Sequence, residues 1–207
     1  RKPIWRARHL KGLCVPEAIF AVPGDLRSPT GGYAYDRRVM ERLPDFGVSV
    51  VHLPLPDSFP TPSDDDVEET IRIIEDRQKP SILVVDGLAY GAFTQPLLDS
   101  LDGRVIALVH HPLFLETGLP HARKVELRNT ETAALLRADH IIVPSRATKR
   151  ILTEHMGLPS QKMTVAEPGT DPAGRATGTG MPLHILYVGA VMPRQGYDVL
   201  VPALSHI

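Results

Sequence analysis

The sequence predicts an α/β protein built on a Rossmann-like parallel sheet with helices on both faces. Short, continuously apolar runs alternate with helix-like segments throughout residues 18–167. Strands that are separated by helices run parallel, and a parallel sheet is apolar on both sides because helices cover both faces. A chain of 207 residues is long enough for one such domain with a full core and for the beginning of another.

The expected strands are short and rich in aliphatic residues, and they cover residues 18–22, 48–53, 82–85, 104–109, 140–143 and 163–166. Helical periodicity between them predicts helices at residues 33–43, from residue 64 onward, and at 93–101, 121–137 and 145–156. In the second helix, Val67, Ile71 and Ile74 are spaced to face a core. The aspartates at 64–66 are interpreted as a helix start, where carboxylates meet the positive end of the helix dipole, rather than as a metal site.

The chain divides into four predicted regions: a leader at 1–17, a domain at 18–167, a linker at 168–182 and the start of a second domain at 183–207. The linker is rich in glycine and proline and shows no periodicity. The last region predicts a strand at 183–188, a turn at Gly189 and a helix from Gly196. A single strand and helix cannot bury their apolar faces, so we expect an incomplete second domain. Residues 183–207 are expected either to form a homodimer or to need the missing domain supplied in trans.

Composition excludes several classes of protein. Hydrophobic residues make up 43% of the chain and charged residues 23%, and the net charge of −1 gives no field that would attract nucleic acid. Cys14 is the only cysteine, which fits a reducing, cytoplasmic compartment. No apolar run reaches the roughly 18–20 residues of a membrane span. The basic leader with Trp5 is either a solvated terminus or a peripheral contact with a membrane surface.

Ligands of parallel sheets bind beyond the carboxyl ends of the strands, and three segments of this chain place polar or glycine-rich residues there. Gly31 and Gly32 directly precede a predicted helix, where free amides and the helix dipole can meet a phosphate, although a structural turn uses glycine in the same way. The loop matches neither the Walker pattern nor the dinucleotide fingerprint.

His110 and His111 follow the strand at 104–109, and imidazoles at that position can hydrogen-bond sugar hydroxyls or a phosphate. Neighbouring strand residues point to opposite faces, so one of the two histidines is expected to be structural unless the strand has already ended. A third segment, the turn at 167–171, is either a ligand contact or an ordinary strand end. Neither H-x-x-x-H nor C-x-x-C spacing occurs, so we expect no metal site and no cofactor, and a hydrolase motif G-x-S-x-G is absent.

Five segments in register carry a resemblance to a known family: TGGYAYDRRVMERL, LVHHPLFLETGL, ADHIIVPSRATKRILTEHMGLP, VAEPGTDPA and LYVGAVMPRQGYDVLVPAL. Together they resemble the retaining family 4 glycosyltransferases, over roughly residues 18–207. The resemblance implies that the first domain is the acceptor half of a GT-B fold. The second domain would hold a nucleotide-activated sugar, and transfer would occur between the two without a metal.

The resemblance also assigns roles to individual residues of the first domain. Gly31 and Gly32 match a loop whose amides approach the donor diphosphate, and His110 matches a catalytic histidine near the transferred sugar. His111 stands where the family is less strict, and Glu116 belongs to a segment that orders the neighbouring loop.

In the second domain, Arg194 matches a basic turn that neutralises the donor phosphates, but Gln195 replaces the lysine of that turn and supplies no charge. The nucleotide-sugar donor site is therefore expected to be incomplete, and the chain is expected to be a fragment or truncated form that is inactive alone. The acceptor is not identified by the sequence. Two alternatives stay open: a non-catalytic α/β binding module, and a nucleotide-binding Rossmann protein of another kind.

Overall fold

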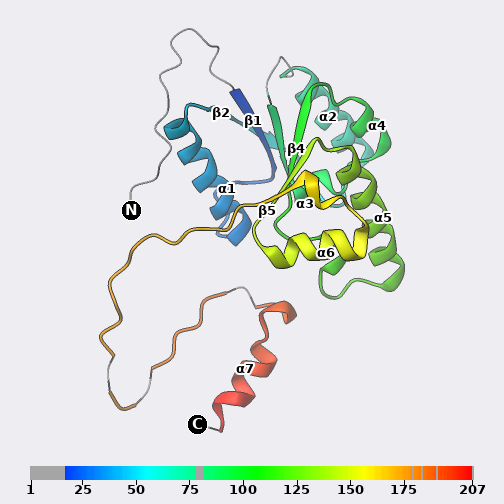
Figure 1. The fold of residues 1–207 in the computed structure, drawn as a ribbon. Coiled ribbons are helices and arrows are strands. Elements are labelled where there is room, and N and C mark those ends of the chain that lie inside the picture. Colours follow the sequence, from blue (N-terminus) through cyan, green and yellow to red (C-terminus); the bar gives the residue numbers. More distant parts are fainter. Residues whose placement is uncertain (1–16, 78–81, 179, 183, 190, 207) are drawn as a thin grey trace. The chain divides into compact units, whose positions relative to one another are not determined.

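The computed structural model describes residues 17–77, 82–178, 180–182, 184–189 and 191–206. The chain forms two units, one that ends at Pro168 and one that begins at Gly169 (Figure 1). The predicted membrane contact of the leader falls on residues 1–16, which lie outside the described part of the chain. Among the described helices, none combines the length and the apolar character that crossing a bilayer requires.

The first unit contains a six-stranded parallel sheet with the strand order β2-β1-β3-β4-β5-β6 (Figure 1). The strands are β1 (Glu17–Pro23), β2 (Ser49–Leu55), β3 (Ile82–Asp86), β4 (Arg104–Leu108), β5 (His140–Val143) and β6 (Met163–Val165). All six lie where the sequence predicted strands, within two residues at each end. The predicted fold class, a Rossmann-like α/β sheet, is confirmed.

The helices of this unit are α1 (Gly31–Arg42), α2 (Asp64–Glu75), α3 (Gly87–Tyr90), α4 (Gln95–Asp99), α5 (His121–Arg137) and α6 (Arg146–Met156), with short 3-10 turns η1 (Leu43–Phe46), η2 (Leu113–Leu115) and η3 (Ser160–Lys162). Helix α1 begins two residues earlier than predicted because the Thr30 side chain accepts a hydrogen bond from the Tyr33 amide at 3.2 Å. The helix predicted at 93–101 is present but shorter, as α4, and the sequence did not predict α3, which follows β3 directly because Asp86 caps it.

Apolar side chains on alternate strand positions form a core on each face of the sheet. In β1, Ile19 and Ala21 belong to the larger core, which is covered by helices α2 to α6. Phe20 and Val22 belong to the smaller core, against which Tyr35 and its neighbours in α1 pack. Removing one such large side chain from water contributes about 1.5–3 kcal/mol, so the alternation along β1 fixes which helix covers which face.

The start of α2 confirms the interpretation of its aspartates. Ser63 is the N-cap, its hydroxyl accepts a hydrogen bond from the Asp66 amide at 3.2 Å, and Asp66 accepts one in return from the Ser63 amide at 3.1 Å. Such a reciprocal cap satisfies two amide groups that a helix start would otherwise leave unbonded.

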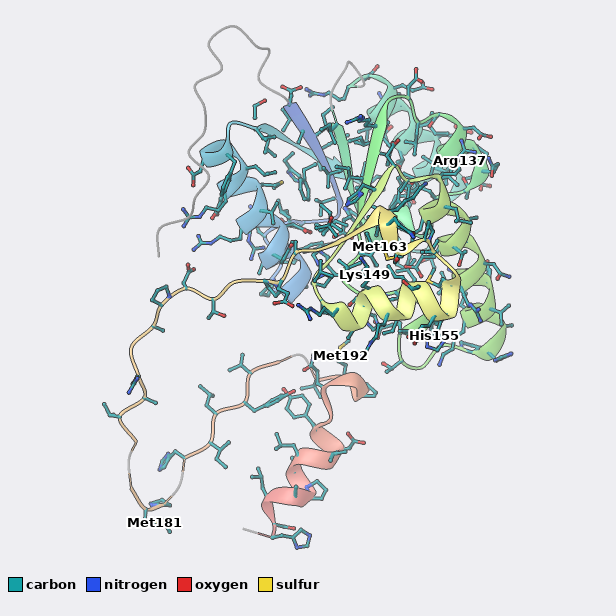
Figure 2. All side chains as sticks on the ribbon, in the orientation of Figure 1. Arg137, Lys149, His155, Met163, Met181 and Met192 are labelled. Atoms are coloured by element: carbon teal, nitrogen blue, oxygen red, sulfur yellow. The ribbon has the colours of Figure 1, made fainter. Side chains whose placement is uncertain are left out.

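The short edge strand β6 is held by side chains from its neighbours. Lys149 of α6 donates a hydrogen bond to the carbonyl of Met163 at 2.9 Å, and Figure 2 labels both residues. Lys162 donates to the carbonyl of Ala138 at 3.1 Å. Because β6 pairs with β5 over only three residues, these side-chain contacts help to hold β6 at the edge of the sheet.

Between the neighbouring strands β1 and β3, the chain connections change from one face of the sheet to the other. Strand β1 continues into α1, which covers the smaller core, whereas β3 continues into α3, which packs in the larger core. The two connections therefore leave neighbouring strands toward opposite faces. A crevice opens at such a switch point, and it is the usual ligand site of open parallel sheets.

The second unit contains a 3-10 turn, η4 (Pro193–Gln195), and helix α7 (Tyr197–Leu204). The predicted strand at 183–188 is wrong for the residues that are described there, since 184–189 have no strand conformation. A strand needs a partner for its backbone hydrogen bonds, and the described part of this unit provides none. The segment is held instead by Tyr187, which packs edge-to-face on Tyr197 and donates a hydrogen bond to the Gln195 side chain at 2.9 Å.

Candidate functional site

A cavity of about 370 Å³ lies at the carboxyl ends of β3 and β4, beside the switch point. This volume is within the range of small-molecule sites. Aliphatic side chains form much of its wall, and several polar groups share its lining. The lining residues are Thr30, Gly32, Tyr33, Pro60, Asp86, Leu88, His110, His111, Leu113, Glu116, Leu119 and Leu127.

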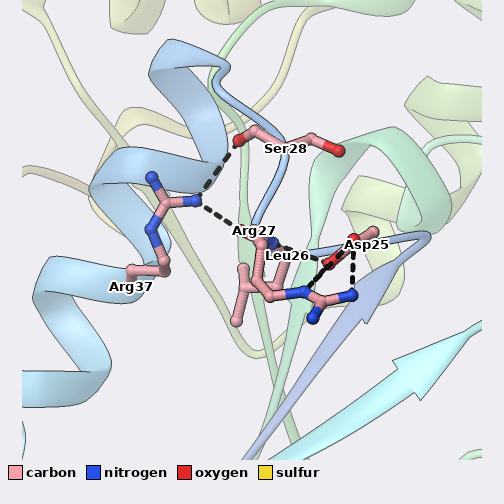
Figure 3. Close-up of polar contacts among 5 residues, drawn as sticks. All are labelled: Asp25, Leu26, Arg27, Ser28 and Arg37. Atoms are coloured by element: carbon pink, nitrogen blue, oxygen red, sulfur yellow. Dashed lines mark hydrogen bonds and ion pairs between the residues drawn. The ribbon is translucent and has the colours of Figure 1, made fainter.

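The loop between β1 and α1 leads to this cavity and is fixed by side chains of α1. The guanidinium of Arg37 donates to the carbonyls of Leu26 and Ser28, as Figure 3 shows. The hydroxyl of Tyr33 donates to the Pro23 carbonyl at 2.6 Å. The helix that supplies the cavity wall therefore also sets the path of the loop before it.

The glycine pair lies inside the first turn of α1 rather than before the helix, which corrects the sequence-based placement. Gly32 lines the cavity, and a Cβ atom there would lie 3.2 Å from the Cδ2 atom of His110. Gly31 is outside the lining set, and a Cβ atom there would meet nothing within 4 Å. The close approach of α1 to His110 thus depends on glycine at position 32 alone.

His110 is held by two carboxyl groups. Its Nε2 atom lies 2.8 Å from Oδ1 of Asp36 in α1 and 3.6 Å from Oδ2 of Asp86 at the end of β3. The ring also meets the edge of Tyr35, with centroids 5.3 Å apart. Asp36 is completely buried and Asp86 is 3% exposed, so both carboxyl groups depend on partners inside the protein.

The three groups shift each other's protonation. Burial raises the pKa of Asp86 to about 7, with a further rise from the charge of Asp36 that His110 partly offsets. Burial alone would lower the pKa of His110, but the hydrogen bond to Asp36 and the charges of both carboxylates outweigh it and raise the pKa above 6.5. Near neutral pH the cluster therefore holds protons that isolated carboxyl groups would have lost.

The cluster also bears on the prediction of no metal site. One ligand atom each from Asp36, Asp86 and His110 lies within 4.8 Å of the others, which makes this a group of described residues with the composition of a metal site. The Nε2 atom is already at hydrogen-bond distance from Asp36, a geometry that suits a proton between them. The absence of a metal stays a prediction, and an experiment below tests it.

His111 and Glu116 also line the cavity. Strand β4 ends at Leu108, two residues before the histidine pair, so the rule that neighbouring strand residues face opposite sides does not apply to it. The buried Nε2 atom of His111 has no hydrogen-bond partner among the described residues. Glu116 accepts a hydrogen bond from the amide of its neighbour Thr117 at 3.1 Å, and its role in ordering the loop that follows the histidines stays a prediction.

Sequence reasoning missed Asp36 and Asp86. Asp36 stands four residues after Gly32, which places it on the same face of α1. Asp86 ends a buried strand at the edge where ligands bind. Both positions were visible in the sequence, but only the fold brings residues 36, 86 and 110 together.

Glu131 is a third residue that the sequence reasoning missed. It is fully buried in α5, four residues from both Leu127 and Leu135 on the core-facing side of the helix. One carboxyl oxygen accepts the Leu113 amide at 3.0 Å, and the other has no partner in the described part of the chain. Burial raises its pKa to about 8, so the carboxyl group is mostly protonated at neutral pH. The sequence does carry a signal for this residue, because helical spacing places a glutamate between two leucines on the apolar face of α5.

Arg194 belongs to the second unit, in turn η4, and its side chain lies outside what the structure describes. Its neighbour Gln195 accepts the Tyr187 hydroxyl through its side-chain oxygen. The same hydroxyl lies 2.9 Å from the Gln195 backbone carbonyl, which any residue here would offer, but a lysine side chain has no acceptor. The glutamine side chain therefore adds a contact within its own unit.

The model of the family described as Glycosyltransferase Family 4 matches residues 65–173, a little over half of the chain. The match extends from α2 to just beyond β6 and includes Asp86, His110 and Glu131. No curated protein matches the chain. A match of this extent, on a Rossmann-like sheet with a cavity at its carboxyl edge, shows that the chain belongs to glycosyltransferase family 4.

Proposed function

We propose that the first unit is the acceptor-binding half of a GT-B glycosyltransferase, which transfers a sugar from a nucleotide-sugar donor with retention at the anomeric carbon. The observation that carries the proposal is the cavity at the switch point, lined by His110 in a chain of family 4. A hydroxyl group of the acceptor would lie in this cavity.

In this proposal the residues of the cavity bind and orient, and the donor phosphate acts as the base. The bond between the anomeric carbon and the phosphate oxygen breaks, and the acceptor oxygen bonds to the same face of the sugar. The departing phosphate takes the acceptor proton. Charge develops on the phosphate, so hydrogen-bond donors and the positive end of α1, at Gly31 and Gly32, would stabilise the transition state. The leucines of the lining would exclude water from the acceptor.

The donor side would require a second Rossmann-like domain, which would include Arg194. The described residues of the second unit form one helix and no strand, and they do not make a nucleotide site by themselves. We therefore propose that a polypeptide of these 207 residues binds an acceptor but does not transfer sugar.

Two assays test this proposal. Nucleoside diphosphate release is measured with a panel of uridine- and guanosine-diphosphate sugars, and no release above background is expected from the 207-residue chain. Release that disappears in His110→Ala would contradict the inactivity and would mean that copies of the chain complete the site. Ligand-observed NMR with a panel of glycosides and alcohols is expected to detect binding that Leu119→Asp abolishes, whereas the exposed control Asp45→Asn retains it.

The alternative, a non-catalytic binding module, is tested by the reading frame around this segment. Continuation into the paired glutamates of a family 4 donor domain would support transfer, and activity of that longer polypeptide should then depend on His110. A stop after codon 207 together with retained ligand binding would favour the binding module.

A further inference from the structure

Two buried carboxyl groups beside one histidine are an arrangement that packing alone does not require. Asp36 has no exposure, and the side chain of Asp86 is 4% exposed. An unpaired carboxylate in such a place costs several kcal/mol, so each needs a proton or a cationic partner. The cluster lies against the proposed acceptor cavity, where His110 contributes to the wall.

The two nitrogens of His110 have different surroundings. Nε2 is directed at the carboxyl oxygens, 2.8 Å from Asp36 and 3.6 Å from Asp86. No residue in the described ranges forms a hydrogen bond with Nδ1. Because the ring lines the cavity, Nδ1 is the nitrogen left for a ligand.

One buried polar atom of the cluster is not satisfied. Oδ2 of Asp36 has no hydrogen-bond partner among the described residues. Burial and the charge of Asp36 raise the pKa of Asp86 to about 7, so the cluster holds a proton near neutral pH. Asp86 is itself fixed by the Leu88 amide, which donates to its Oδ1 at 2.6 Å.

We propose that Asp36 and Asp86 are positioning residues that hold His110 with its Nε2–H bonded to Asp36 and its Nδ1 turned to the substrate. While the ring is charged, Nδ1–H donates to a hydroxyl or phosphate oxygen. When the ring loses its proton, Nε2 keeps the proton shared with Asp36, and Nδ1 accepts from a hydroxyl group. The carboxylates thus decide which nitrogen meets the ligand and over which pH range it is a donor.

Several titratable side chains surround His110. Helix α1 contributes Asp36 and Tyr35, and β3 contributes Asp86. Tyr33, His111 and Glu116 share the cavity lining with His110. Burial raises the pKa of both tyrosines, and nearby carboxylates raise it further, so neither is charged in the range where His110 titrates. Of these groups, Asp36 and Asp86 are the two that raise the pKa of His110.

The first test uses the unmodified chain and ring-nitrogen NMR of the histidines, with His110→Gln to assign the signals of residue 110. Above the titration midpoint, the expected neutral form carries its proton on Nε2. A neutral form protonated on Nδ1 would overturn the inference without any variant that must fold. The midpoint itself is expected above 6.5.

The second test compares Asp36→Asn and Asp86→Asn with Asp45→Asn, an exposed aspartate in η1 whose side chain is 62% accessible. Asp36→Asn should move the His110 midpoint to lower pH by more than Asp86→Asn, because it removes the shorter contact, and Asp45→Asn should not move it. An unchanged midpoint in a folded Asp36→Asn chain would contradict the inference. Addition of Zn²⁺ should leave the signals of His110 unchanged, and a zinc-dependent displacement would assign the cluster to a metal instead.

The substrate-facing role of Nδ1 rests on the proposed function, whereas the titration does not. The expected tautomer and midpoint with no acceptor binding would uphold the positioning by the aspartates and reject the acceptor site. Acceptor binding with the opposite tautomer would uphold the site and reject the positioning.

Discussion

At the scale of single residues, Gly31 and Gly32 occupy neighbouring positions in α1 with different surroundings. We expect Gly32→Ala to displace the His110 ring, because the added methyl group would lie 3.2 Å from Cδ2. Gly31→Ala adds a methyl group in open space and should stabilise the chain by roughly 0.5–1 kcal/mol through helix propensity. Ring signals of His110 and urea unfolding measure both effects. Equal behaviour of the two variants would show that the contact at Gly32 is unimportant.

Glu131 should make the stability of the protein depend on pH. Its pKa in the folded chain is about 8, above the ordinary value of 4.5, so the folded state binds the proton more tightly than the unfolded state. This stability is present below pH 4.5 and is lost as pH rises toward 8, by an amount on the order of 4 kcal/mol. Glu131→Gln cannot titrate, so its unfolding free energy should fall less between pH 5 and pH 8.5.

The matched control is Glu154→Gln, an exposed glutamate in α6, which should follow the unmodified chain at every pH. Asp86 also binds a proton more tightly when folded, so some pH dependence should persist in Glu131→Gln. Parallel curves for the Glu131→Gln and unmodified chains would mean that the buried carboxyl group is ionised throughout.

At the scale of elements, α3 depends on close packing against the end of β4. A Cβ atom at Gly87 would lie 3.0 Å from both the Leu108 carbonyl oxygen and the Cα atom of Val109, which are backbone atoms and cannot rotate away. We expect Gly87→Ala to destabilise the chain by about 1–3 kcal/mol, measured by chemical denaturation. Gly169→Ala, where an added Cβ atom meets nothing within 4 Å, serves as the control, and a similar result for both would contradict the packing argument.

The elements themselves were predictable because their signals are local. The helix at 121–137 and the strand at 140–143 have the predicted bounds, since periodicity and burial agree there. The strand expected at 183–188 was wrong because an apolar run becomes a strand only beside a partner. The site was predictable in part: His110 follows a strand, a local signal, whereas its pairing with Asp36 spans 74 positions and depends on the strand order.

At the scale of the whole molecule, the second unit presents apolar surface. Leu186 is 87% exposed, Val188 84% and Val199 69%. We predict that residues 183–207 associate with another copy of the chain, because burying this surface gains about 25 cal/mol for each Å². Light scattering of the 207-residue chain should show concentration-dependent association, and a version that ends at Gly174 should be monomeric. A monomer at high concentration, unaffected by the shortening, would reject this prediction.

The hydroxyl of Tyr35 donates a hydrogen bond to the carbonyl of Ala166 at 2.9 Å and joins α1 to the segment that follows β6, 131 positions away. Contacts between residues so far apart in the sequence slow folding, because a large part of the chain must be ordered before they form. We therefore expect this bond to form late, after the central strands have paired. On a ribosome, residues 35 and 166 can meet only when nearly all of the first unit has emerged, so we expect α1 to pack first on β1 and to join the segment after β6 at the end of synthesis.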